Sequence, residues 1–304
     1  MPVRPFDLLD LPFLPRYRKH VVTLDSARHA TRGNPLGVAA LLSYLDPRCH
    51  IYTAVNSSNG ANIIGQMVQA EGQTFARLTF LTPADRVEAA AGALLDHLAG
   101  QAGTWGVHNL LAEVDEGQSA LRTLRQAGFA MVAWQSVWKM ASHFRGIGSG
   151  YWESPREEDL LAVQSLYCQI VPALMQPVEP LPRQIEGRAY HTENGLQAYA
   201  AVTDGPAGIW IQPLIPPDSE CSAAMLASLA QNLVGRGRRP VYICVRSYQA
   251  WLESILEETG AKAGPRQAVL VKRLAILKKA EQPVQAVESA LPKPAAPAAQ
   301  TDSS

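Results

Sequence analysis

The stretch Phe75–Leu95 reads FARLTFLTPADRVEAAAGALL, and it decides how the rest of the chain is interpreted. Its first part is an apolar run typical of a buried strand, and the alanine-rich part after Arg86 has a strong helix propensity. The proline and aspartate between the two parts mark a turn. Backbone N–H groups gather where a strand turns into a helix, and proteins commonly bind phosphate groups there. The stretch therefore looks like a phosphate-binding turn in which alanines replace the usual glycines.

The same order of elements occurs twice along the chain. In the first half the strand pattern FARLTFLTP leads to a helix pattern, the strand NLLAEV, a second helix pattern that ends at Gly128, and the strand MVAWQSVWKM. In the second half AGIWIQPLIPP leads in the same way to PVYICV, a helix pattern that ends at Gly260, and QAVLVKRLAIL. Glycine suits the left-handed conformation that ends many helices. This internal repeat predicts two halves of similar structure.

Turn signals predict further strands before each of these units. Pairs ending in glycine separate β-rich runs at Asn59-Gly60, Glu71-Gly72, Asn194-Gly195 and Asp204-Gly205, as in β-hairpins. Each half also begins with a short extended piece and an acidic helix start. We therefore expect each half to contain a helix, a meander of about three strands, and then helix, strand, helix and strand.

The repeat divides the chain into two α/β domains. We expect an N-terminal domain at 1–141, a linker at 142–150 with the sequence SHFRGIGSG, and a C-terminal domain at 151–279. Residues 280–304 are rich in proline, alanine and serine. Such a segment cannot supply a hydrophobic core, so it is predicted to be a disordered tail.

Composition excludes several classes of partner. The chain has 27 Lys+Arg and 27 Asp+Glu, so no excess of positive charge favours nucleic acid. Its four cysteines form no C-x-x-C pair and its histidines form no H-x-x-x-H pair, so no metal site is expected. Prolines and aspartates interrupt the apolar N-terminus, and no run is long enough to span a membrane. We expect a cytoplasmic protein that does not associate with membranes, and its oligomeric state stays open.

The order of elements resembles the GCN5-related N-acetyltransferase (GNAT) superfamily, here as a tandem of two GNAT-like mixed-sheet domains. In that family two neighbouring parallel strands part, and the turn after one of them reads Arg or Gln, two variable residues, Gly, one variable residue, and Gly or Ala. Backbone N–H groups of the turn hold the pyrophosphate of acetyl-coenzyme A. Arg86, Ala89 and Ala91 occupy the three defined positions in this sequence, and Leu94 and Leu95 follow where the family usually has a Leu-Leu pair.

The resemblance implies a coenzyme site in the first half, formed by Phe80, Leu81, Thr82, Arg86, Val87, Glu88, Ala89, Ala90 and Ala91. Backbone N–H groups at Leu81 and its neighbours would polarise the thioester carbonyl. Ala89 stands where the family has glycine, so its Cβ crowds an approaching phosphate, and Glu88 adds a negative charge. The sequence therefore leaves open whether binding of acetyl-coenzyme A is retained, weakened or lost. A competing interpretation is that the alanine-rich segment is only a helix packed on a sheet.

The second half departs further from the family pattern. Pro217, Glu220 and Ser222 fall at the three defined positions of its turn, and a carboxylate at Glu220 would face the pyrophosphate, so no coenzyme is expected there. In the family a tyrosine on the following helix often protonates the leaving thiolate. That position is Leu124 in the first half and Leu256 in the second, and leucine cannot donate a proton.

Glu113 and Asp115 are the weak candidates for a catalytic base, since the catalytic residues are otherwise unknown and FARLTFLTP carries no carboxylate before its turn. A competing interpretation makes them a solvated strand end and, at Asp115, a helix N-cap. The resemblance implies an acyl-CoA-dependent N-acyltransferase, specifically an N-acetyltransferase that transfers the acyl group directly from acetyl-CoA to a small amine. The alternative is a non-catalytic tandem protein that binds a ligand or partner. The acceptor amine and the acyl chain length stay open.

Overall fold

The computed structural model describes residues 3–7, 10, 14–37, 47–58, 61–141, 151–181, 185–219, 223–234 and 239–274. The predicted linker at 142–150 and tail at 280–304 lie outside these ranges, as do Asn59-Gly60, Glu220 and Ser222.

The first half contains these elements in chain order: β1 (Arg4–Pro5), α1 (Leu14–Tyr17), β2 (Val22–Thr23), α2 (Ser26–Arg32), β3 (Cys49–Ser58), β4 (Ala61–Ala70), β5 (Phe75–Thr82), the 3-10 turn η3 (Ala84–Arg86), α4 (Val87–Thr104), β6 (Asn109–Asp115), α5 (Ala120–Gln126) and β7 (Ala130–Lys139). The second half contains β8 (Tyr151–Glu153), the 3-10 turn η4 (Glu157–Asp159), α6 (Leu160–Ile170), β9 (Gly187–Thr192), β10 (Gly195–Asp204), β11 (Ile209–Leu214), α7 (Ala223–Val234), β12 (Val241–Arg246), the 3-10 turn η5 (Ser247–Gln249), α8 (Trp251–Glu258) and β13 (Lys262–Arg273).

The predicted repeat is confirmed by the order of strands. In each half a run of antiparallel strands (β3-β4-β5 and β9-β10-β11) leads to one parallel pair, β5 with β6 and β11 with β12. The crossover helices α4 and α7 connect these pairs. Gly128 and Gly260 end the equivalent helices with φ of 85° and 75°, in the left-handed region that favours glycine.

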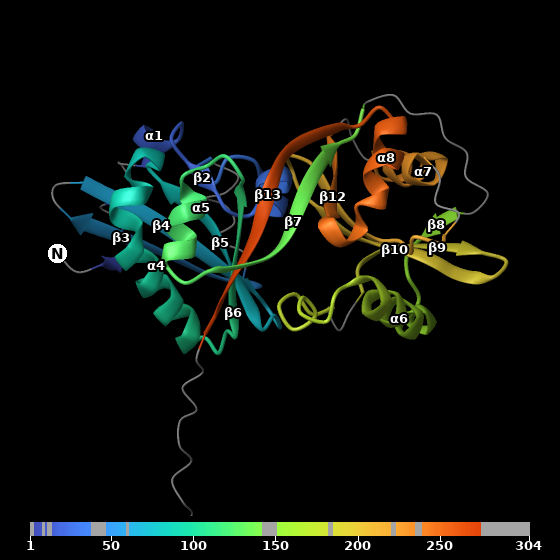
Figure 1. The fold of residues 1–304 in the computed structure, drawn as a ribbon, viewed down its shortest axis with the longest axis horizontal. Helices are drawn as coiled ribbons and strands as arrows, with labels where there is room; N and C mark the ends of the chain where they lie inside the picture. The colour runs from blue at the N-terminus through green and yellow to red at the C-terminus, as the bar shows by residue number, and fades with distance from the viewer. Residues whose placement is uncertain are drawn as a thin grey trace, which may run out of the picture.

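The two halves share one sheet of 13 strands because they exchange their last strands. In the part of the chain that the structure describes, twelve strands follow one another in the order β1-β3-β4-β5-β6-β13-β7-β12-β11-β10-β9-β8, and the thirteenth, β2, pairs with β5 outside this row. Strand β13 of the second half therefore pairs with β6 of the first, and β7 of the first half pairs with β12 of the second. In Figure 1 β13 and β7 run side by side through the middle of the molecule. The division of the chain into two domains by a linker at 142–150 stays a prediction. In the sheet, the last strand of each half is inserted next to strands of the other half.

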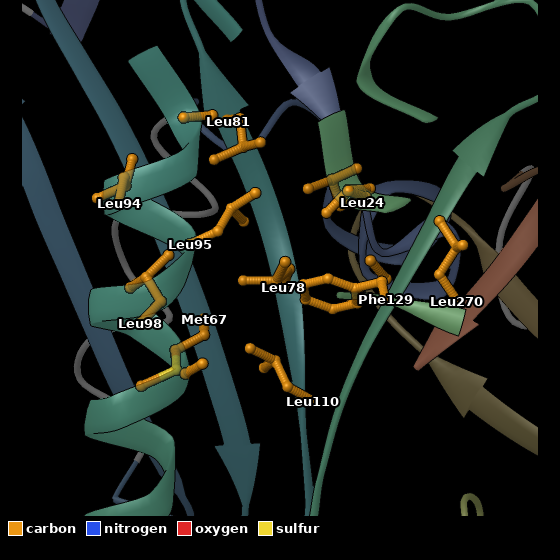
Figure 2. Close-up of a cluster of buried hydrophobic side chains, with 14 of the residues drawn as sticks. Leu24, Met67, Leu78, Leu81, Leu94, Leu95, Leu98, Leu110, Phe129 and Leu270 are labelled. Atoms are coloured by element: carbon orange, nitrogen blue, oxygen red, sulfur yellow. The ribbon is translucent and has the colours of Figure 1, made fainter. Parts of the chain in front are cut away.

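Helices cover both faces of the sheet. In the second half α7 and α8 lie on one side and α6 lies on the other (Figure 1). In the first half α4 packs on β3 and β4, and it approaches so closely that a Cβ added at Gly65 of β4 would lie 3.1 Å from both Leu94 and Leu98 of α4. Figure 2 shows Leu94, Leu95 and Leu98 on α4, and all three are fully buried members of the core cluster that contains Leu78 and Leu110. Each fully buried leucine contributes about 1.5–3 kcal/mol.

The segment after α6 connects the two halves. Val178 packs with Leu111 of β6 and Val271 of β13 in one small buried cluster. The Asn109 side chain donates a hydrogen bond to Pro177 O at 2.9 Å. This segment of the second half is therefore fixed against the sheet of the first half.

Candidate functional site

Strands β5 and β6 part in the first half and leave an opening in the sheet. They pair only from Phe75 with Asn109 to Arg77 with Leu111, although β5 continues to Thr82 and β6 continues to Asp115. The pairing of β5 with β4 is also irregular between the Gln66–Phe80 and Met67–Leu78 pairs, which leaves Thr79 as the extra residue of a bulge. We call the gap between β5 and β6 beyond Arg77 the N-terminal opening.

The predicted coenzyme residues gather where β5 meets α4, beside this opening. Phe80, Leu81, Thr82, Val87 and Ala91 are buried, Ala90 is half-buried, and Arg86, Glu88 and Ala89 are exposed. The exposed Arg86 Nε lies 3.6 Å from a carboxylate oxygen of Asp85. Ala89 faces solvent in the first turn of α4. The structure thus brings the nine residues together at one corner of the first half.

The chain's own backbone occupies the N-terminal opening. Strand β2 pairs antiparallel with β5, with Val22 opposite Leu81 and Thr23 opposite Phe80. Leu24 then bridges both sides, since its N–H donates to Thr79 O at 2.9 Å and its carbonyl accepts from Glu113 N at 2.8 Å. We call Val22–Leu24 the bridging segment. In this arrangement a coenzyme cannot lie in the opening, so the residues fit acetyl-CoA only after the bridging segment has moved.

The side chain of Leu24 fixes the bridging segment in place. It is 1% exposed and belongs to the same core cluster as Leu78, Leu81 and Leu110. Figure 2 shows it on one side of β5, in the group of buried side chains that includes Leu78 and Phe129. Hydrophobic burial therefore adds to the backbone hydrogen bonds that hold this segment.

The second half has an equivalent opening, which a side chain fills. Strands β11 and β12 pair only from Ile209 with Val241 to Ile211 with Ile243. Beyond that point Gln249 Nε2 donates to Pro213 O at 2.9 Å, and Ile215 N donates to Gln249 Oε1 at 3.2 Å. Each opening is thus closed by groups of the chain itself.

Glu113 is a buried ion-pair partner, which corrects the interpretation of this residue as part of a solvated strand end. It is 2% exposed, and its Oε1 accepts from Arg77 Nη1 at 3.0 Å while its Oε2 accepts from Ser26 N at 3.0 Å. Burial alone would raise the pKa of Glu113, but the charges of Arg77 and Arg246 leave this pKa below its ordinary value. The carboxylate is therefore ionised and already engaged at neutral pH.

Asp115 is not the N-cap of α5, which is a second correction. Helix α5 begins at Ala120 with Ser119 as its N-cap residue. The Asp115 carboxylate instead accepts from Gln118 at 3.0 Å and from Gln267 of β13 at 2.9 Å. It holds the exchanged strand against the end of β6.

Leu124 and Leu256, at the family's tyrosine position, are fully buried in the cores of the two halves. No hydroxyl group therefore stands at that position in either half. Any proton needed by a leaving thiolate would have to come from another group or from water.

Sequence reasoning missed a cluster of four charged side chains at the junction of the halves. Arg77 contacts both Glu113 and Glu179, and Arg246 Nη2 lies 2.7 Å from Glu179 and 3.5 Å from Glu113. We call these four residues the central ion cluster. The available signal was an arginine within each of the apolar runs FARLTF and VYICVR, because an arginine is rarely fully buried unless it is paired.

Comparisons with known proteins agree with this architecture. No protein-family profile matches the sequence, and no curated protein matches it significantly. Several solved structures cover most of the chain, and two of them have a TM-score above 0.5. A tandem GNAT protein from the clavulanic acid biosynthesis pathway is 16% identical and has a TM-score of 0.52, covering 89% of this chain and 98% of its own. A GCN5-related N-acetyltransferase from Sphaerobacter thermophilus is 12% identical and has a TM-score of 0.53, covering 89% and 95%.

These similarities establish the fold, since the sequence identities are low. The chain has the tandem GNAT fold, an α/β architecture with a mixed sheet in each half. None of the described helices is long and apolar enough to cross a membrane. Among the described residues there is also no group of three histidine, cysteine or acidic side chains that could hold a metal ion.

Proposed function

We propose that the protein is an acyl-CoA-dependent N-acyltransferase that uses acetyl-coenzyme A in its N-terminal half and acts on a small amine. The observation that supports this proposal is the N-terminal opening itself. There β5 parts from β6 after Arg77, carries a bulge at Thr79 and leads through Arg86 into the first turn of α4. A helix N-terminus with an arginine beside it favours a bound pyrophosphate.

Binding of the coenzyme requires the bridging segment to leave the opening. Its two hydrogen bonds through Leu24 are each worth about 1 kcal/mol net, and the buried Leu24 side chain is worth about 1.5–3 kcal/mol. The closed arrangement is therefore favoured by roughly 4 kcal/mol, which lowers an apparent affinity about a thousandfold. We infer that acetyl-CoA binds weakly to the unmodified protein.

A non-catalytic tandem protein that binds a ligand or partner is the second candidate. Two observations favour it specifically: Val22–Leu24 fills the first opening and Gln249 fills the second. On this reading both openings are permanent parts of the core, and any ligand binds elsewhere.

Calorimetric titration with acetyl-CoA, together with an assay of thiol release over a panel of small amines, tests the proposal. Ala89→Gly is expected to tighten binding, because it removes the Cβ beside the helix N-terminus, and Arg86→Ala is expected to weaken it. Arg273→Ala, which removes an exposed arginine at the far end of β13, is the matched control and leaves binding unchanged. Binding that responds to neither Ala89→Gly nor Arg86→Ala would locate the coenzyme elsewhere, and no binding by any variant would favour the non-catalytic protein.

A further inference from the structure

A cavity of about 170 Å³ lies between the two halves, beside the part of β5 from Phe75 to Arg77 that still pairs with β6. Its walls come from Phe75 and Arg77 of the first half and from Glu179, Gln212 and Tyr248 of the second, among others. Phe75 and Leu81 are six residues apart on β5, a separation of about 20 Å. Neither half alone contains this cavity, so we call it the inter-half cavity.

The charges in its walls are already paired. Arg77 and Glu179 contact each other across the wall, and each also contacts a second member of the central ion cluster, Glu113 for Arg77 and Arg246 for Glu179. The cluster holds two positive and two negative groups. A charged ligand would therefore give up part of its hydration without finding a free counter-charge among these four groups, which is unfavourable.

Three polar groups in the walls remain available for a ligand. The side chains of Gln73, Gln212 and Tyr248 form no hydrogen bond with any residue that the structure describes, and all three line the cavity. Burial raises the pKa of Tyr248 to about 12, so its hydroxyl is a hydrogen-bond donor at neutral pH. By contrast, the hydroxyls of Tyr167 and Tyr199 donate to Glu179 O at 2.7 Å and to Glu186 O at 2.6 Å. The available groups comprise one hydroxyl and two amides, which suit a carbonyl or an amide of a ligand.

The rest of the wall is apolar, and its volume suits one ring. Phe75, Met175 and Leu214 contribute to it, and an apolar cavity of about 150 Å³ is known to take up benzene. We propose that the inter-half cavity binds an uncharged molecule with a single ring or an apolar body of that size, carrying an amide or hydroxyl group. This proposal is independent of acyl transfer.

Binding of three matched probes to the full-length protein tests the proposal. Benzamide, benzoate and benzylamine share one ring and differ in charge at neutral pH. Ligand-observed NMR is expected to detect benzamide with a dissociation constant of about 1 mM, as suits so small a ligand. Benzoate and benzylamine are expected to bind at least about tenfold more weakly. Similar binding of all three probes, or no binding of benzamide up to its solubility limit, would overturn the proposal.

Two variants locate the binding. Ala201→Leu places a larger side chain in the cavity and is expected to abolish benzamide binding, whereas Ala130→Leu, at an exposed position of β7, leaves it unchanged. Gln212→Leu is expected to weaken benzamide about tenfold through a lost hydrogen bond while leaving toluene unaffected. Benzamide binding that survives both Ala201→Leu and Gln212→Leu would overturn the assignment to this cavity. None of these readings uses acetyl-CoA, so their failure is distinct from failure of the proposed acyl transfer.

Discussion

Removing one member of the central ion cluster is expected to destabilise the protein strongly. Arg246 is 1% exposed and lies 2.7 Å from Glu179 and 3.5 Å from Glu113. Arg246→Met preserves much of the buried volume but leaves the buried Glu113 and the partly exposed Glu179 to share Arg77. Breaking a buried ion pair from one side costs about 3–5 kcal/mol. With a urea dependence of about 3 kcal/mol per molar, the unfolding midpoint falls by about 1–2 M.

The matched experiment restores the charge balance. Arg246→Met combined with Glu179→Gln removes one positive and one negative group and leaves Arg77 with Glu113, so we expect the double variant to regain more than half of the lost stability. Arg156→Met serves as control, because it breaks an exposed ion pair with Glu153, and it should leave the midpoint within error. If the double variant unfolds as easily as the sum of the two single variants, the four charges do not act as one balanced cluster.

Three further predictions concern stability and turnover. Burial raises the pKa of Asp25 above its ordinary value of 3.8. The protonated side chain therefore stabilises the folded state below pH 3.8, and this stabilisation is lost as the pH rises and the carboxyl ionises. Asp25→Asn, which keeps the N-cap acceptor, should gain stability relative to the parent between pH 4 and pH 7 in urea unfolding. Residues 1–141 alone lack β13, so they should not fold as a monomer, and a cooperative monomeric transition in calorimetry would refute the strand exchange. Leu124→Tyr inserts a phenol into a fully buried position and is expected to lower the free energy of unfolding by about 1–3 kcal/mol. If the protein transfers acyl groups, thiol release by this variant should exceed that of the parent, by up to about 10²–10⁴-fold for full general acid assistance.

Another prediction, made from composition alone, concerns the end of the chain. Truncation after Lys279 should leave the melting temperature within error, because a segment rich in proline and alanine buries little apolar surface. A fall of several degrees in the melting scan would mean that residues beyond Lys279 pack on the folded chain.

Local patterns were sufficient to predict the elements and their repetition. Alternating or continuous apolar runs indicated the strands, and Gly128 and Gly260 indicated equivalent helix ends, because glycine takes up the left-handed conformation with little strain. The exchange of β7 and β13 was not predictable in this way. Both strands carry the pattern of a buried strand, and that pattern does not specify which neighbour a strand pairs with.

The candidate site was predicted only in part for the same physical reason. The corner from Phe80 to Ala91 is continuous in sequence, so its residues had to lie together. The bridging segment and Gln249 close the openings through contacts between residues far apart in the chain. The local sequences VVTLD (21–25) and SYQ (247–249) contain no pattern that predicts those contacts. Burial of Glu113 likewise depends on Arg246, which lies more than one hundred residues away along the chain.

The most direct test of this account is the affinity of acetyl-CoA for the Leu24→Ala variant, measured by calorimetry beside the parent protein. Truncating a buried leucine costs about 2–5 kcal/mol, and at Leu24 much of that cost weakens the closed arrangement of the bridging segment. Leu110→Ala removes an equally buried leucine of the same cluster from β6 rather than from the bridging segment, and is the matched control. If the bridging segment closes the coenzyme site, Leu24→Ala binds acetyl-CoA at least about tenfold more tightly than the parent while Leu110→Ala does not. A folded Leu24→Ala variant that binds acetyl-CoA no better than the parent would contradict this account.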